Sequence, residues 1–363
     1  MKVTIEERVL HFKQPAGTSR GVYTERRIWL VTVTDGEHVG RGECAPLPDL
    51  SCDARADYEE VLRGFCDRLE QTGEIPYEAM RDYPSMLFGL ETAMIDCSRK
   101  EERGRRNEAL GQRSLATEGT QEGGVLFDTA FSRGEVGIPI NGLVWMGNYD
   151  EMLQRMEQKL EQGFRCVKLK IGAIDFDQEL ELIKRIRKRF SFHEVELRLD
   201  ANGAFPYEEA LYKLELLSQY NIHSIEQPIR QGQWAYMAEL CRESPLPIAL
   251  DEELIGVNDA EMKSHLLNVI KPRYIVLKPS LHGGMMGCRE WIDTAREHGV
   301  GSWITSALES NVGLNAIAQF CSSVYGDDIT MPQGLGTGQL FTDNIPMPLE
   351  IRGDRLWRCA SDK

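Results

Sequence analysis

The chain has 363 residues, of which 42% are hydrophobic and 27% charged. This length suits one barrel of about 250 residues with a smaller domain, and the composition excludes a disordered chain. The net charge of −15 argues against a nucleic-acid partner, and no run approaches the roughly 18 apolar residues of a membrane span. The nine cysteines form no CxxC pair, which predicts reduced thiols and a cytoplasmic protein with no membrane partner. Nothing in the chain predicts an oligomeric state.

Residues 1–112 predict an α+β capping domain. Two β-rich runs flank Asp35-Gly36, a typical hairpin signal, and two amphipathic helical patterns follow. The first pattern opens with Asp53 as a candidate cap and ends at Gly73. Residues 113–136 are rich in Gly, Ser and Thr, which indicates either a loosely structured connection between domains or a long surface loop within one domain.

From 137 to 339, short β-rich runs alternate with longer amphipathic ones. Such alternation predicts βαβ units and a parallel sheet, and eight runs favour a closed barrel. The last segment, 340–363, resembles one more strand and is expected to return to the N-terminal domain. The eight runs are 138–145, 166–172, 194–202, 222–228, 246–252, 274–280, 301–307 and a weaker one at 329–336.

A charged residue closes each of five successive runs. The residues follow one another at intervals of 25 to 30, about one βα unit, so all five should lie at the C-terminal rim, where barrel enzymes build their active sites. Any one of them could be a solvated charge, but the regular recurrence argues against that for the set. They are Lys170, Asp200, Glu226, Asp251 and Lys278.

The three carboxylates of this set predict a metal site. Burying Asp200, Glu226 and Asp251 together is costly unless a cation compensates. The set contains only oxygen ligands, which suit Mg²⁺, with Mn²⁺ as a substitute.

The lysines predict acid–base chemistry. Lys170 and Lys278 would flank the metal, and a lysine beside a divalent cation and another ammonium has a lowered pKa and can act as a base. Lys168 shares the strand face of Lys170, so it could lower that pKa or attract an anionic substrate. The candidate substrate-binding residues are Ser306, which could also be a loop hydroxyl, Arg198, which should face the barrel interior, and Asn202, which could orient a metal ligand or form an ordinary turn.

These motifs resemble a known family. KxK at 168–170, LDAN at 199–202, IEQP at 225–228, LDE at 250–252 and LKP at 277–279 are similar to the muconate-lactonizing subgroup of the enolase superfamily. Within it, GECAPLP at 42–48, SALESNVGLNAIAQF at 306–320 and GLGTGQLF at 334–341 resemble the o-succinylbenzoate synthase family. The resemblance covers nearly the whole chain and is weakest at 103–136.

The resemblance implies a (β/α)7β modified TIM barrel, of the α/β class, with an N-terminal α+β capping domain. It implies that Asp200, Glu226 and Asp251 bind Mg²⁺, that Lys170 is the general base and that Lys278 stabilises an enediolate. Cap segments 13–23 and 46–53 would close over a small carboxylate substrate.

The implied activity is syn dehydration of 2-succinyl-6-hydroxy-2,4-cyclohexadiene-1-carboxylate in menaquinone biosynthesis. N-acylamino acid racemization is the nearest alternative, and some relatives catalyse both reactions. Dipeptide epimerization is disfavoured because GLGTGQ stands where that group places Asp-x-Asp, and muconate lactonization is a weaker option. An alternative of another class is a non-catalytic Mg²⁺-binding barrel.

Overall fold

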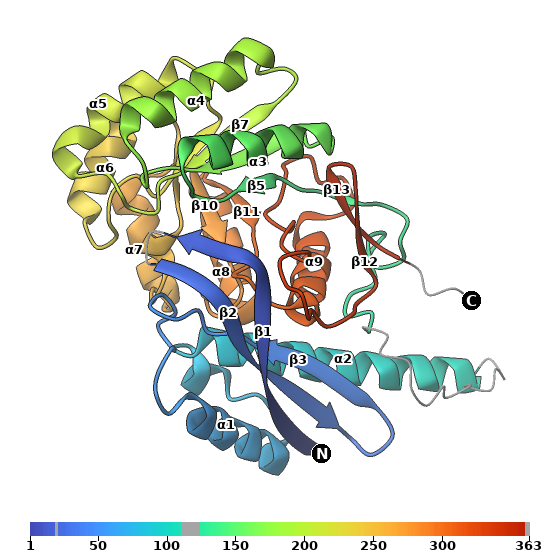
Figure 1. Ribbon diagram of the computed structural model, residues 1–363. Coiled ribbons are helices and arrows are strands. Elements are labelled where there is room, and N and C mark those ends of the chain that lie inside the picture. Colours follow the sequence, from blue (N-terminus) through green and yellow to red (C-terminus); the bar gives the residue numbers. More distant parts are fainter. Residues whose placement is uncertain (19–20, 110–123, 360–363) are drawn as a thin grey trace.

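The computed structural model describes residues 1–18, 21–109 and 124–359. Its N-terminal part is an antiparallel sheet in the order β1 (Lys2–Thr18), β2 (Gly21–Thr34) and β3 (Val39–Cys44) (Figure 1). The predicted hairpin is confirmed, because β2 and β3 are joined through Asp35 and Gly36. The Asp35 carboxylate accepts the backbone N–H groups of Glu37 and His38 at 2.9 and 2.7 Å.

Helices cover one face of this sheet, as the sequence predicts: α1 (Tyr58–Thr72), the short η1 (Tyr77–Met80) and α2 (Pro84–Ala109). Strand β3 lies so close to α2 that a Cβ atom at Gly42 would collide with the carbonyl of Gly89. Helix α1 ends at Gly73, as predicted, with φ 74°. The prediction that Asp53 caps α1 is wrong: its carboxylate accepts the N–H and hydroxyl of Ser85, in the first turn of α2, at 2.8 and 2.6 Å.

The second part is a parallel sheet of seven strands in sequence order, which alternate with helices. These strands are buried on both faces: all five residues of β6 are buried, including Lys168 and Lys170, which alternate with apolar residues. The strands are β5 (Gly142–Val144), β6 (Cys166–Lys170), β7 (Glu196–Asp200), β8 (Ser224–Glu226), β9 (Ile248–Leu250), β10 (Tyr274–Leu277) and β11 (Gly301–Ile304). The helices are α3 (Tyr149–Glu161), α4 (Phe176–Arg189), α5 (Tyr207–Ser218), α6 (Trp234–Glu243), η2 (Glu252–Leu254), α7 (Ala260–Ile270), α8 (Gly284–Glu297) and α9 (Asn311–Tyr325).

The weak eighth run closes the barrel. Gly334 donates its N–H to Ile304 O at 2.8 Å on one side, and Asn141 donates its N–H to Gln333 O at 3.0 Å on the other. Only isolated bridges form, because so few residues pair. The predicted (β/α)7β barrel with an N-terminal α+β domain is therefore confirmed.

The segment after the barrel first returns to the N-terminal sheet, where Lys13 N–H donates to Leu340 O at 2.8 Å and Thr342 N–H to His11 O at 2.9 Å. The prediction of one further strand is wrong. The chain forms a hairpin, β12 (Leu349–Arg352) and β13 (Arg355–Arg358), which pairs with β4 (Ile138–Pro139) beside the barrel. The turn at Gly353, with φ 60°, reverses the chain within what reads as one run.

The predicted connection at 113–136 falls partly outside the described residues, which resume at 124. Its described part is packed and ordered. Leu126 and Phe131 are buried, and Leu126 N–H donates to the Gln319 side chain on α9 at 2.7 Å. The expectation of a loosely structured segment is therefore wrong for 124–136.

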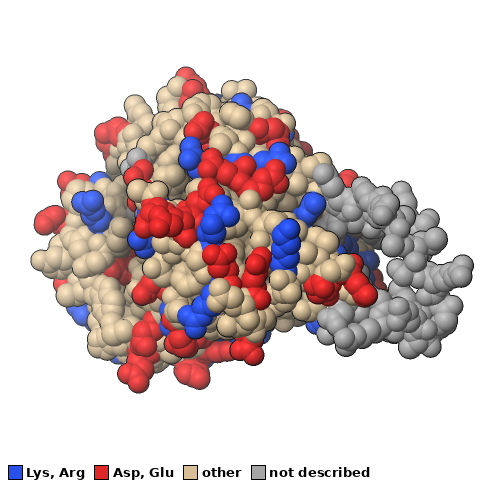
Figure 2. Space-filling view, turned by 90° about the horizontal axis from the view of Figure 1, so that it is seen from below, with Lys and Arg blue, Asp and Glu red and all other residues tan. Residues whose placement is uncertain are grey.

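Acidic and basic side chains are interspersed over the face seen in Figure 2. All nine cysteines are free thiols, as predicted. None of the described helices has both the length and the apolar character needed to cross a membrane.

Candidate active site

The five rim residues lie at adjacent positions on the barrel. Lys170 pairs in register with Asp200, and Asp200 with Glu226, at the last residues of β6, β7 and β8. Asp251 and Lys278 directly follow β9 and β10. The parallel register therefore brings together what the spacing predicted, since the carboxyl ends of all these strands meet at one rim.

Lys168 is held by two of the predicted metal ligands. Its Nζ lies 2.9 Å from Asp200 Oδ2 and donates to both Glu226 oxygens at 2.8 and 2.7 Å. Both carboxylates are almost fully buried. The Lys168 ammonium therefore offsets buried negative charge. Lys168 points toward these carboxylates because it lies on the same face of β6 as Lys170.

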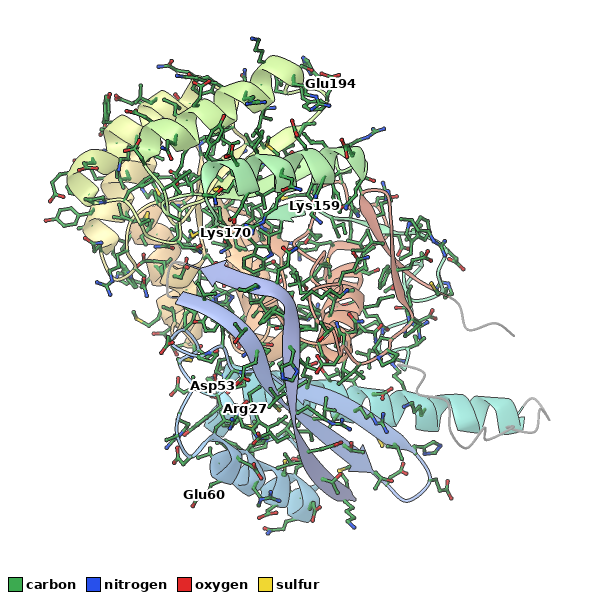
Figure 3. All side chains as sticks on the ribbon, in the orientation of Figure 1. Arg27, Asp53, Glu60, Lys159, Lys170 and Glu194 are labelled. Carbon is green, nitrogen blue, oxygen red and sulfur yellow. The ribbon has the colours of Figure 1, made fainter. Side chains whose placement is uncertain are left out.

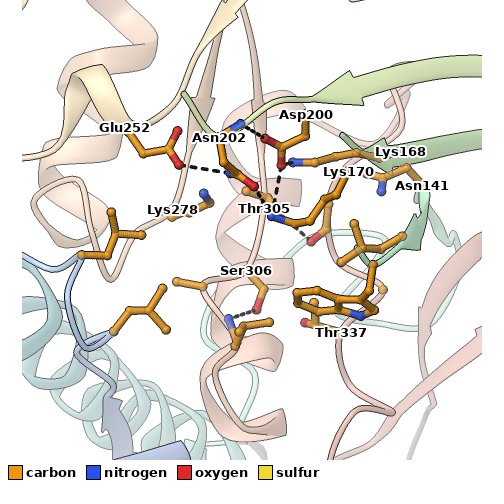
Figure 4. A pocket seen from close by; sticks show the side chains of 18 of the residues that line it. Asn141, Lys168, Lys170, Asp200, Asn202, Glu252, Lys278, Thr305, Ser306 and Thr337 are labelled. Atoms are coloured by element: carbon orange, nitrogen blue, oxygen red, sulfur yellow. Dashed lines mark hydrogen bonds and ion pairs between the residues drawn. The ribbon is translucent and has the colours of Figure 1, made fainter. Parts of the chain in front are cut away.

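Lys170 lies in the pocket close to Asp200 and Asn202 (Figure 4). Its Nζ donates to Asn202 Oδ1 at 2.8 Å, lies 3.4 Å from Asp200 Oδ2 and lies 5.7 Å from the centre of the Trp145 ring. Asn202 has a left-handed backbone, donates its N–H to Asp200 Oδ1 at 3.1 Å and its amide to Glu252 at 3.1 Å. Asn202 therefore both forms a turn and orients Asp200 and Lys170.

Lys278 forms an ion pair with Asp251, which is fully buried. The backbone N–H of Lys278 donates to His282 Nδ1 at 2.8 Å. Burial lowers the pKa of His282 to about 3, so its ring is neutral and can accept this hydrogen bond. This hydrogen bond fixes the backbone at Lys278.

The pKa values of the buried lysine and carboxyl groups shift in different directions. Burial disfavours the Lys168 ammonium, but attraction to Asp200, Glu226 and Asp251 outweighs it and raises the pKa of Lys168. Burial likewise opposes ionisation of Asp200, but Lys168 and Lys170 lower its pKa. For Glu226, burial and repulsion from the other two carboxylates raise the pKa well above its usual value. Ionisation is therefore favoured at Asp200 and disfavoured at Glu226, although both carboxyl groups are buried in the same cluster.

Within the described part of the chain, no group of three or more His, Cys, Asp or Glu side chains is spaced to hold a metal ion directly. Lysine ammonium groups lie beside the carboxylate oxygens instead. The donor set nevertheless fits Mg²⁺: it supplies three buried carboxylates, and Asp251 Oδ1 is buried without a hydrogen-bond partner. The metal-ligand assignment stays a prediction.

These residues border a pocket that opens to solvent. Lys168, Lys170, Asp200, Asn202 and Lys278 line it, whereas Glu226 and Asp251 do not. Figure 3 places Lys170 between the barrel and the tips of β1 and β2. Both predicted cap segments contribute to the lining, through Tyr23 from 13–23 and through Leu47 and Leu50 from 46–53.

A buried arginine joins the cap to the barrel behind the pocket. Arg26, on β2, donates to the carbonyls of Pro46 and Ala45 in the cap and to Leu308 O (3.2 Å) and Ala307 O (3.3 Å) in the barrel. Leu47, Ala307 and Leu308 border the pocket. Arg26 therefore holds together two loops that shape its walls.

Two predicted substrate-binding residues need comment. Ser306 lines the pocket, but its hydroxyl donates to Glu309 Oε2 at 2.6 Å. Arg198 faces the barrel interior, as predicted, yet it does not reach the pocket. Its guanidinium pairs with Glu196 at 2.7 Å, donates to Pro332 O at 2.9 Å and lies 4.6 Å from the Trp303 ring centre. The prediction that Arg198 binds substrate is wrong, because Arg198 lies two residues below the rim on β7.

One wall of the pocket consists of residues that were not predicted from the sequence. Asn141, Leu143 and Trp145 all line it. They alternate along the β5 run in the same way as Lys168 and Lys170 do along β6, so the period-two signal was available. Thr337, in the glycine-rich segment 334–338, also lines the pocket, and no periodic signal marks it.

Comparison with known families agrees with this architecture. Residues 151–356 match the family model described as enolase C-terminal domain-like, and residues 18–97 match the N-terminal domain of MenC. The first match spans more than half of the chain.

Full-length relatives narrow the assignment. The chain is 46% identical to an o-succinylbenzoate synthase of Desulfotalea psychrophila, over 98% of each chain, and 26% identical to one of Bacillus subtilis, over 97% of this chain and 89% of that one. The crystal structure of MenC from Desulfotalea psychrophila superposes with a TM-score of 0.77 and 39% identity, over 98% of this chain and 99% of that one. The chain therefore belongs to the enolase superfamily, and within it to the o-succinylbenzoate synthase family.

Proposed function

We propose that this protein is an Mg²⁺-dependent carbon–oxygen lyase that dehydrates 2-succinyl-6-hydroxy-2,4-cyclohexadiene-1-carboxylate to o-succinylbenzoate. One observation carries the proposal: Lys170 and Lys278 line the same pocket, and each forms an ion pair with a buried carboxylate of the barrel rim. Full-length similarity to o-succinylbenzoate synthases supports the choice of substrate.

The first step is removal of the proton on the carbon that bears the carboxylate. Lys170 Nζ takes this proton, and the C–H electron pair moves onto the carboxylate as an enediolate. Asn202 orients Lys170 Nζ through the 2.8 Å hydrogen bond. The ammonium of Lys278, from a different part of the rim, faces the same pocket and stabilises the negative charge.

A bound Mg²⁺ would be held by Asp200, Glu226 and Asp251 and would supply electrostatic stabilisation of the substrate carboxylate.

The second step is loss of the β-hydroxyl group. Lys170, now protonated, returns its proton to the departing oxygen on the same face, so the hydroxyl leaves as water. The ring becomes aromatic, and Lys170 Nζ has given up the proton that it took in the first step.

The product is expected to enter menaquinone biosynthesis. A cytoplasmic location and a small-molecule carboxylate as the partner go with this proposal, and nine free thiols support it.

Turnover assays test the substrate. The cyclohexadiene carboxylate should be converted to o-succinylbenzoate far more efficiently than N-succinylamino acids are racemized, because dehydration needs a single base on one face. Ultraviolet absorbance of the aromatic product and circular dichroism of the amino acids measure the two reactions.

Turnover of the N-succinylamino acids that is several orders of magnitude more efficient would instead assign racemization. Lys170 and Lys278 would then act as bases on opposite faces of the α-carbon. A non-catalytic barrel predicts neither turnover nor solvent deuterium exchange at the substrate α-carbon, with or without Mg²⁺. Either result would overturn the dehydratase assignment.

A further inference from the structure

Two buried polar residues lie on the pocket wall, and the side-chain hydroxyl of one of them has no hydrogen-bond partner in the described protein. Thr337 is 6% exposed, and its Oγ1 is buried without a partner. Asn141 is 5% exposed, and its backbone N–H donates to Gln333 O at 3.0 Å, which leaves its side-chain amide to the pocket. Both residues line the pocket (Figure 4). Buried polar groups in native proteins are nearly always paired, so the unpaired Thr337 hydroxyl on a pocket wall indicates that a ligand pairs with it.

The fold brings these residues together across the seam that closes the barrel. Asn141 precedes β5, and Thr337 follows the closing segment at 333–334. A Cβ at Gly336 would lie 3.3 Å from Asn141 O, and one at Gly334 would collide with the Thr305 hydroxyl. The glycines therefore let this segment lie tightly against both neighbouring strands, which places Thr337 at the pocket.

This wall differs in charge from the rest of the pocket. The ionisable groups of the lining are Tyr23, Lys168, Lys170, Asp200, Glu252 and Lys278. Beside Asn141 and Thr337 stand Leu143, Trp145 and Thr305, and the Thr305 hydroxyl is already committed to Gly334 O at 2.9 Å. Asn141 and Thr337 thus offer neutral donors, which suit an acceptor oxygen that need not be the reacting carboxylate.

We propose that Asn141 and Thr337 form a subsite that hydrogen-bonds an acceptor oxygen of the acyl side chain of the substrate. The proposal rests on the proposed function, because it assigns the ring carboxylate to the charged rim and the side chain to the neutral wall. The acceptor is the ketone or the terminal carboxylate of that chain. The subsite selects substrates by their side chain and takes no part in proton transfer.

Calorimetric titration in Mg²⁺ with three ligands tests it: o-succinylbenzoate, 2-butanoylbenzoate, which keeps the ketone but lacks the terminal carboxylate, and benzoate. Thr337→Val should weaken o-succinylbenzoate binding about tenfold, the effect of one lost hydrogen bond, and leave benzoate binding unchanged. Thr337→Ser, which keeps the hydroxyl, should bind as the wild type does. Equal tenfold weakening for 2-butanoylbenzoate assigns the ketone, and no weakening assigns the terminal carboxylate.

Thr92→Val is the matched control, since the Thr92 hydroxyl is buried in α2 and donates to Phe88 O at 2.8 Å, away from the pocket. It should change no affinity. The subsite is wrong if Thr337→Val leaves o-succinylbenzoate affinity unchanged or weakens benzoate equally. If that happens while the wild type dehydrates the cyclohexadiene, only the subsite fails; a wild type that neither binds o-succinylbenzoate nor turns over refutes the proposed function as well.

Discussion

Replacing Lys170 by alanine is expected to lower turnover of the cyclohexadiene substrate by about 10⁴-fold, the upper end of what a positioned proton-transfer group contributes. The Nζ of Lys170 lies in the pocket beside Asp200 and Asn202, and it is the group proposed both to take the α-proton and to return it to the leaving hydroxyl. Steady-state kinetics measure the loss. The melting temperature should change little, because Asp200 keeps its ion pair with Lys168.

Lys184→Ala is the matched control for this variant. Lys184 lies on α4 with its side chain 45% exposed and only a long surface contact to Glu181. It should keep wild-type kinetics and stability. Near-normal turnover in Lys170→Ala would show that another group is the base.

Asp251→Asn is expected to weaken Mg²⁺ binding by at least about 100-fold, since even partners that only orient metal ligands contribute 10- to 100-fold. Asp251 is fully buried, and its Oδ1 has no hydrogen-bond partner, so this atom is available to a cation. The amide would remove the negative charge and leave Lys278 without its ion-pair partner. Calorimetric titration of the substrate-free protein with MgCl₂ measures the affinity directly.

Asp259→Asn makes the same chemical change away from the pocket. Asp259 is the exposed N-cap of α7, and asparagine caps a helix equally well. It should leave Mg²⁺ affinity intact. Equal affinities in Asp251→Asn and wild type would remove Asp251 from the proposed ligand set.

The rim residues could be predicted because a parallel barrel converts sequence spacing into position. A charge that closes each successive run must lie at the same end, whatever the intervening helices do. The period of two gives the face of a strand but not the height along it, which explains the error at Arg198. Two residues span about 7 Å of strand, enough to place Arg198 beside Glu196 and Trp303 rather than in the pocket.

Other features depend on partners far away in the chain. Asp53 caps α2 instead of α1. Its carboxylate meets Ser85 only after the N-terminal domain has folded. Ser306 is engaged by Glu309, and that contact depends on the loop conformation after β11. Thr337 reaches the pocket through close packing of Gly334 and Gly336, which composition alone does not reveal.

A crystal structure of the protein with Mg²⁺ and o-succinylbenzoate tests the central claim most directly. The account predicts one Mg²⁺ bound by Asp200, Glu226 and Asp251, with Lys170 and Lys278 Nζ on either side of the ring carbon that bears the carboxylate. A pocket that holds the ligand without a metal ion, or with either lysine Nζ turned away from that carbon, would contradict it.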